Sequence, residues 1–122
     1  MKLAWLTDPH LNFAGIQQAQ RLMAEVRAMS AQALLVSGDI GEAPDLEGWL
    51  DVMATQAGCP VYFVLGNHDF YHETIAEVRA TAMVLSQRYA RLCWLGAGEV
   101  VELTPHTALI GHDGWGDARL GD

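Results

Sequence analysis

The sequence predicts an α/β fold built on a mostly parallel sheet, and two features of its pattern support that prediction. Short apolar runs alternate with longer segments whose apolar residues recur at a helical period. A strand, helix, strand, helix, strand order needs crossover connections, which place successive strands parallel in one sheet. Because the apolar runs are continuous rather than alternating, we also expect both faces of the sheet to be covered.

Three strand and helix pairs follow one another along the chain. The predicted strands are 3–6, 33–36 and 61–65, and the predicted helices are 15–29, 44–57 and 73–89. The second helix has the clearest start, because Pro44 suits a first turn and Asp45 and Glu47 favour the positive end of the helix dipole. Shorter strands are predicted at 94–95, 99–103 and 107–110, separated by turns at 96–98 and 104–106.

Length and charge set limits on the class of protein. The 122 residues suit one domain, residues 1–122, and the composition is ordinary for a globular protein. Asp and Glu number 15 against 7 Lys and Arg, for a net charge of -8. An acidic surface repels phosphate backbones, which argues against nucleic-acid binding. A phosphate substrate is still compatible, because bound divalent cations reverse the local sign of charge.

Cysteine usage and hydropathy indicate the compartment. Cys59 and Cys93 form neither a metal-type pair nor a disulfide framework, so we interpret both as small buried residues. That interpretation fits a reducing compartment. The apolar run before Thr7 is too short for a signal peptide, and no run is long enough to span a membrane. We therefore expect a cytoplasmic protein that makes no membrane contact.

Metal-ligating residue types follow the predicted strands. The four loops are Thr7-Asp8-Pro9-His10, Ser37-Gly38-Asp39-Ile40, Gly66-Asn67-His68-Asp69 and Gly111-His112-Asp113. The carboxyl ends of parallel strands form the ligand crevice of an open sheet. We therefore expect these loops to converge on one edge, although they are far apart in sequence.

The residue types in these loops suit a pair of divalent cations. Asp8 and His10 lie two residues apart and can chelate one ion from an extended turn. The carboxylate of Asp39 can bridge two ions, and Asn67 offers an amide oxygen to the second. Mixed oxygen and imidazole donors suit Mn, Fe, Zn, Co or Ni better than a calcium cage. Two ions roughly 3.5–4 Å apart can share a hydroxide and hold the attacking and leaving oxygens of a phosphoester.

The ordered set of motifs resembles the calcineurin-like metallophosphoesterases over nearly the whole chain. The motifs are Asp8-x-His10, Gly38-Asp39 and Gly66-Asn67-His68-Asp69, in that order and each after a strand. The resemblance implies a layered αββα sandwich and a hydrolase, a phosphatase or phosphodiesterase of small molecules, that uses a dinuclear centre and a metal-activated hydroxide.

The resemblance also assigns roles to individual residues. Asp8 and His10 would bind the first metal, Asp39 would bridge both, and Asn67 would bind the second. His68 would contact the phosphate and protonate the leaving oxygen. Asp69 would orient His68 and tune its charge, as carboxylates commonly do for histidines.

The chain departs from the family pattern after these loops. The family continues with a lone histidine and a Gly-His-x-His loop, whereas His112 lies in Gly-His-Asp-Gly and the sequence stops at Asp122. We therefore expect about the first half of the sandwich, a truncated domain. His112 and Arg119 are candidate contacts to substrate or metal, with a solvated tail as the alternative for Arg119.

A second function fits the same departure. The chain would then be a weakly active or inactive homologue that acts as a metal-binding or interaction module. Its missing C-terminal half, or a second copy in a homodimer, would cover the exposed edge and apolar face of the sheet.

Overall fold

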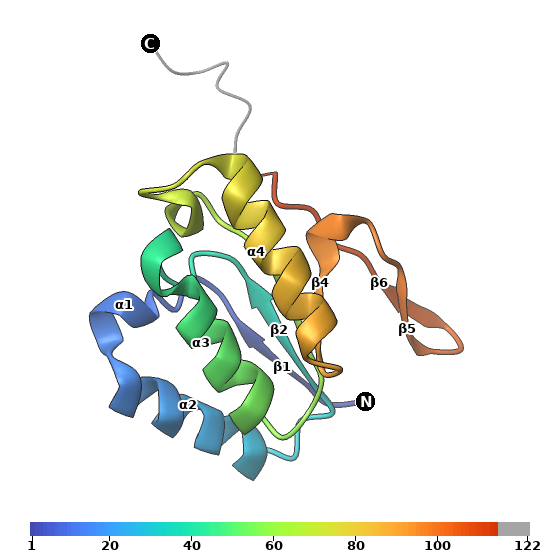
Figure 1. Cartoon of the computed structure of the whole chain (residues 1–122). Coiled ribbons are helices and arrows are strands. Elements are labelled where there is room, and N and C mark those ends of the chain that lie inside the picture. Colours follow the sequence, from blue (N-terminus) through green and yellow to red (C-terminus); the bar gives the residue numbers. More distant parts are fainter. Residues whose placement is uncertain (115–122) are drawn as a thin grey trace.

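The computed structural model describes residues 1–114 and is built on a four-stranded sheet in the order β1-β2-β3-β4 (Figure 1). The strands are β1 Leu3–Leu6, β2 Ala33–Ser37, β3 Val61–Val64 and β4 Leu92–Trp94. Each strand pairs in parallel with the next. The predicted α/β fold with a parallel sheet is confirmed, and the carboxyl ends of all four strands lie at one edge.

Three helices make the crossovers, and all of them lie on the same face of the sheet. They are α2 Ile16–Ala28, α3 Ala43–Gln56 and α4 Ile75–Arg88, and Figure 1 shows them side by side over the strands. The strand order always advances in one direction, so right-handed crossovers place every helix on one side. Shorter turns are α1 Leu11–Ala14, η1 His68–Phe70 and η2 Leu95–Ala97.

Local sequence explains where the helices begin. In α3, Glu42 and Asp45 form a reciprocal capping box and Pro44 occupies the first turn. In α4, the Thr74 side chain accepts a hydrogen bond from the backbone N–H of Glu77. These caps start both helices close to the carboxyl edge of the sheet, where the loops of interest lie.

The two faces of the sheet differ in burial. The strand side chains beneath the helices are buried: Ala4, Leu34, Val36, Val61, Phe63, Leu92 and Trp94. On the other face Trp5 is 69% exposed, and Leu35 and Tyr62 are half-buried. The expectation that both faces are covered is therefore wrong for residues 1–114. Helices cover one face only, because the crossovers never change direction.

The last two strands do not extend the parallel sheet. β5 Val101–Thr104 and β6 Thr107–Leu109 form a separate antiparallel hairpin, which projects beside the sheet in Figure 1. The predicted strands at 99–103 and 107–110 are confirmed as strands. The predicted strand at 94–95 is instead the end of β4 followed by η2. The chain then returns from the hairpin to the sheet at residues 111–114.

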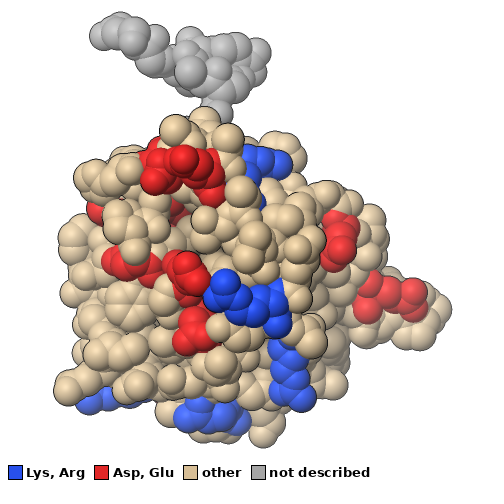
Figure 2. Space-filling model, in the orientation of Figure 1, with Lys and Arg blue, Asp and Glu red and all other residues tan. Residues whose placement is uncertain are grey.

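Charge is unevenly distributed over the helical face. Figure 2 shows acidic side chains on the upper part of the visible face and basic ones mainly on the lower part. Asp45 and Glu77 lie in the first turns of α3 and α4 and contribute to the acidic end. Within the described part of the chain, no helix has the length and apolar character needed to cross a membrane.

Candidate metal centre

The loops after β1 and β2 adopt an uncommon backbone conformation at three predicted ligands. Asp8, His10 and Asp39 have φ values of 50, 42 and 50°. Non-glycine residues seldom occupy this left-handed region, and such strain concentrates at functional sites. Two backbone hydrogen bonds hold the loops together, from His10 N to Asp39 O at 3.0 Å and from Leu11 N to Ile40 O at 2.8 Å. The backbone therefore fixes these side chains before any ion binds.

Two glycines allow the loops after β2 and β3 to touch. A Cβ atom on Gly66 would lie 2.1 Å from Oδ1 of Asp39, and one on Gly38 would lie 2.7 Å from the backbone nitrogen of Gly66. Both distances are far inside van der Waals contact. Gly38 also has φ +93°, which glycine adopts without strain. The two loops can approach this closely only because both positions lack a side chain.

The side chain of Asp69 joins the loops after β2 and β3 to each other. Its Oδ1 accepts hydrogen bonds from the backbone N–H groups of Ile40 at 2.9 Å and Gly41 at 3.0 Å, and its Oδ2 accepts from Gly66 N at 2.8 Å. The residue is fully buried. Burial raises the pKa of Asp69 to about 6, while these three N–H groups act to lower it. The geometry makes Asp69 a structural link between loops, and its predicted pairing with His68 stays a prediction.

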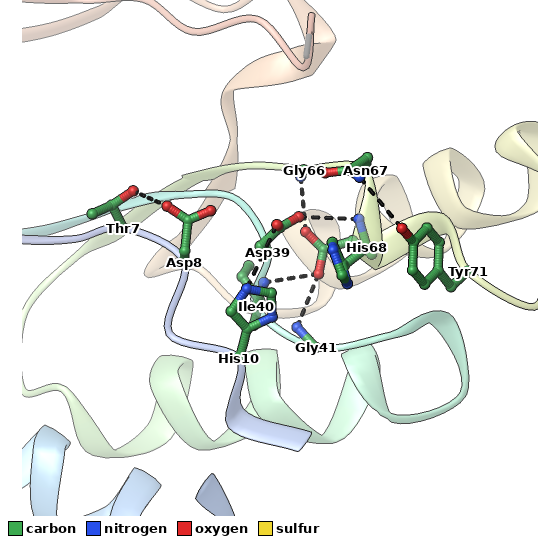
Figure 3. A network of polar contacts seen from close by, with 11 residues as sticks. Thr7, Asp8, His10, Asp39, Ile40, Gly41, Gly66, Asn67, His68 and Tyr71 are labelled. Carbon is green, nitrogen blue, oxygen red and sulfur yellow. Dashed lines mark hydrogen bonds and ion pairs between the residues drawn. The ribbon is translucent and has the colours of Figure 1, made fainter. Parts of the chain in front are cut away.

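Three of the predicted site residues form a compact group at this edge. His10, Asp39 and His68 each offer one ligand atom, and these atoms lie within 4.8 Å of one another. Figure 3 shows the two imidazoles and the carboxylate facing each other. Nε2 of His10 is 3.7 Å from Oδ2 of Asp39, and the His68 backbone N–H donates to Oδ1 of Asp39 at 3.0 Å. The His10 and His68 rings meet edge to face at 4.9 Å.

The donor set fits a divalent transition metal. Two imidazoles and a carboxylate suit Zn, Mn, Fe, Co or Ni better than calcium. Nδ1 of His10 is buried and has no hydrogen-bond partner in the described structure, so one ring nitrogen is free for an ion. The family resemblance implied that His68 contacts the phosphate rather than a metal. The structure brings His68 to the side chains of His10 and Asp39, so this assignment stays a prediction.

Four predicted residues line one open cleft beside this group. Asp8, Asp39, Asn67 and His112 are among the residues around a cavity of about 260 Å³. Loops that follow β1, β2, β3 and β6 therefore converge as the sequence predicts. His112 arrives by way of the hairpin and not from a fifth parallel strand. The remaining candidate, Arg119, lies outside the described residues.

Tyr71 contacts two residues of the site. Its hydroxyl accepts a hydrogen bond from Nδ2 of Asn67 at 3.5 Å, and its ring lies 4.4 Å from that of His68. With Nδ2 directed to Tyr71, the amide oxygen of Asn67 is the atom left for a cation. On the far side, the Thr7 hydroxyl donates to Oδ2 of Asp8.

The anchoring role of Asp113 is what sequence reasoning missed. Its carboxylate accepts from Leu65 N at 2.8 Å and from Trp94 Nε1 at 3.2 Å, so it fixes the loop after β6 against β3 and β4. Its position after a strand was visible in the sequence, but no local pattern indicates that the β5–β6 hairpin brings the chain back to the sheet.

His72 lies outside the group formed by His10, Asp39 and His68. It pairs instead with Glu42 at 3.1 Å and is largely exposed.

Comparison with known families identifies the class of protein. The family model of the calcineurin-like phosphoesterases matches residues 1–119. The chain therefore belongs to the calcineurin-like phosphoesterase family, in agreement with its parallel sheet and the order of its strand-end motifs. A search of curated proteins found no match.

Proposed function

We propose that this chain carries the catalytic edge of a metal-dependent phosphoesterase acting on small-molecule phosphoesters. The observation that supports it is the group of His10, Asp39 and His68, whose ligand atoms lie within 4.8 Å of one another. That group lies beside a cleft also lined by Asp8 and Asn67. Membership of the phosphoesterase family supplies the reaction class.

The proposed roles follow the positions of the side chains. Asp8 and His10 would hold one divalent cation, Asp39 would serve both ions of a pair, and Asn67 would offer its amide oxygen to the second. Such cations supply Lewis acidity and positive charge to a phosphoester when bound. The chain itself contributes preorganisation of the donor atoms. The left-handed backbone fixes the loops that carry Asp8, His10 and Asp39. The hydrogen bonds of Asp69 then tie the loops after β2 and β3 together.

His68 is the proposed general acid for the leaving oxygen. Its backbone N–H is bonded to Asp39 and its ring lies between those of His10 and Tyr71, so the imidazole has a defined place. Imidazole is suited to proton transfer near neutral pH. Tyr71 limits the rotation of the ring on the side away from His10.

A generic aryl phosphodiester assayed with added Mn²⁺ tests this function. His68→Ala is expected to lower kcat by about 100-fold or more, the usual contribution of a positioned acid. His106→Ala is the matched control, because His106 lies exposed in the β5–β6 turn. Equal rates in the wild type, His68→Ala and Asp39→Ala would reject the enzymatic proposal for this chain.

A second candidate function is an interaction module completed by another chain. The uncovered sheet face favours it, since Trp5 is 69% exposed there. A groove of about 210 Å³ on this face is lined mainly by apolar residues, among them Trp5, Leu35, Tyr62, Val64, Leu109 and Ile110. A monomer by light scattering, combined with no Mn²⁺ binding, would count against this candidate.

The free thiols of Cys59 and Cys93 agree with the proposed cytoplasmic location.

A further inference from the structure

The segment after β6 is held at the carboxyl edge of the sheet by an ion pair between the nearly buried carboxylate of Asp113 and the half-exposed side chain of Arg79. The side chain of Asp113 is 7% exposed, and its Oδ2 lies 3.2 Å from an Arg79 guanidinium nitrogen. The same carboxylate accepts from Leu65 N and from the indole N–H of Trp94. The Arg79 guanidinium in turn lies 4.7 Å from the centroid of the Trp94 ring. Since the charge is paired and fully hydrogen-bonded, this attachment is well defined.

Close packing leaves the segment little freedom. A Cβ on Gly96 would lie 2.4 Å from Oδ2 of Asp113, and a Cβ on Gly111 would lie 2.6 Å from Cβ of Leu95. The backbone therefore approaches the sheet as closely as glycine permits. His112, between Gly111 and Asp113, is carried to the cleft shared by the proposed ligands.

One hydrogen bond fixes which nitrogen of His112 carries the proton. The backbone N–H of Gly114 donates to Nδ1 of His112 at 2.8 Å. A backbone N–H can only donate, so Nδ1 is unprotonated and the neutral ring carries its proton on Nε2. A metal-ligating histidine normally shows the reverse arrangement, in which its second nitrogen donates to an acceptor. The contact seen here is with a donor, so it disfavours Nε2 as a metal ligand.

We propose that His112 binds the substrate, with its Nε2–H donating to a non-bridging oxygen of the phosphoryl group. This rests on the proposed function and assigns a residue to its substrate side. The other side-chain donors of the cleft each already make a hydrogen bond within the protein, and only the second N–H of the Asn67 amide is left beside His112. Ser37 Oγ lies within hydrogen-bond distance of Leu6 O, and Asn67 Nδ2 donates to Tyr71. The Nε2–H of His112 therefore supplies a donor to a phosphate that the acidic lining would otherwise repel.

The tautomer is the first test and needs neither metal nor activity. Long-range proton–nitrogen correlation spectra at pH 8 distinguish protonated from unprotonated ring nitrogens, and the spectrum of His112→Gln assigns the His112 signals. We expect the proton on Nε2. A proton on Nδ1 would overturn the proposal, because Nε2 would then be free to bind a metal.

The second test separates cation binding from phosphate binding. Mn²⁺ is titrated into the protein by calorimetry, and inorganic phosphate is then titrated into the Mn²⁺-loaded protein. His112→Ala should leave Mn²⁺ affinity within about twofold and weaken phosphate binding about tenfold, as expected for one lost hydrogen bond. His112→Gln, which keeps an N–H donor of similar reach, should recover part of the loss.

The outcomes against the proposal are distinct. A loss of Mn²⁺ affinity in His112→Ala would make His112 a metal ligand, and unchanged phosphate affinity would remove it from the substrate site. If wild type itself binds no Mn²⁺, the proposed function fails, and the phosphate contact fails with it even where the tautomer is as expected.

Discussion

Replacing Gly66 by alanine should disrupt the metal centre without touching any proposed ligand. The added Cβ would lie 2.1 Å from Oδ1 and 2.6 Å from the backbone nitrogen of Asp39. The collision is with a carboxylate and a main-chain atom, so it cannot be relieved by rotating the end of a flexible side chain. Asp39 must move, and the hydrogen bond from the His68 backbone N–H is lost with it.

The size of the effect follows from two contributions. Overpacking of a tightly packed site costs about 1–3 kcal/mol. The lost hydrogen bond to the Asp39 carboxylate adds about 1 kcal/mol. We therefore expect Gly66→Ala to lower the free energy of unfolding by about 2–4 kcal/mol in the metal-free protein. Its Mn²⁺ affinity should fall as well, because Asp39 no longer lies beside His10.

Gly48→Ala is the matched control. Gly48 lies inside α3, and a Cβ added there meets nothing within 4 Å. Alanine is the better helix former, so this variant should gain about 0.5–1 kcal/mol. Urea unfolding followed by far-UV circular dichroism measures both variants. If Gly66→Ala matches wild type in unfolding free energy and in Mn²⁺ affinity, the close approach of the two loops is not as described.

Three further predictions concern single residues. In the metal-free protein the raised pKa of Asp69, about 6, stabilises the fold below pH 4, and this stability is lost as pH rises through 6. Between pH 4 and 7 the free energy of unfolding of the wild type should therefore fall by up to about 3 kcal/mol relative to that of Asp69→Asn. Urea unfolding that gives both proteins the same pH dependence would contradict this. Burial and the Glu99 carboxylate raise the pKa of Cys93 to about 11, so its thiol should react slowly with an aromatic disulfide at pH 8 and faster in Glu99→Gln. Trp5→Gln should change the thermal unfolding free energy by less than about 1 kcal/mol, because Trp5 is 69% exposed; a larger loss would show that the face is covered.

The order of elements was predictable because local patterns determine it. Helical periodicity, Pro44 and the apolar strand runs each depend on neighbours within a few residues. Coverage of the sheet was not predictable in this way. The predicted strand at 33–36 looks buried on both faces from its sequence, although Leu35 is half-buried on the uncovered side. Which face is covered depends on crossover direction, a property of the whole topology.

The site residues were likewise predictable where local sequence determines them and not where the whole topology does. Ligand candidates were predictable because Asp8, Asp39 and Asn67 each lie in the loop that follows a strand, and the ends of parallel strands must lie at one edge. The anchoring role of Asp113 was not predictable, because its partners Leu65 and Trp94 are 48 and 19 residues away and are reached through a hairpin. The left-handed backbone of the ligand loops was equally hidden, since Asp and His do not require it.

A Mn²⁺ titration of wild type and Asp39→Asn tests the central claim most directly. Asparagine keeps an oxygen that can accept from the His68 backbone N–H, so the loop structure should survive while the charge is removed. Glu102→Gln is the control, an exposed acidic residue on β5. If these strand-end loops form a metal centre, Asp39→Asn lowers Mn²⁺ affinity at least about tenfold and Glu102→Gln leaves it unchanged. Equal affinity in all three proteins would contradict the account.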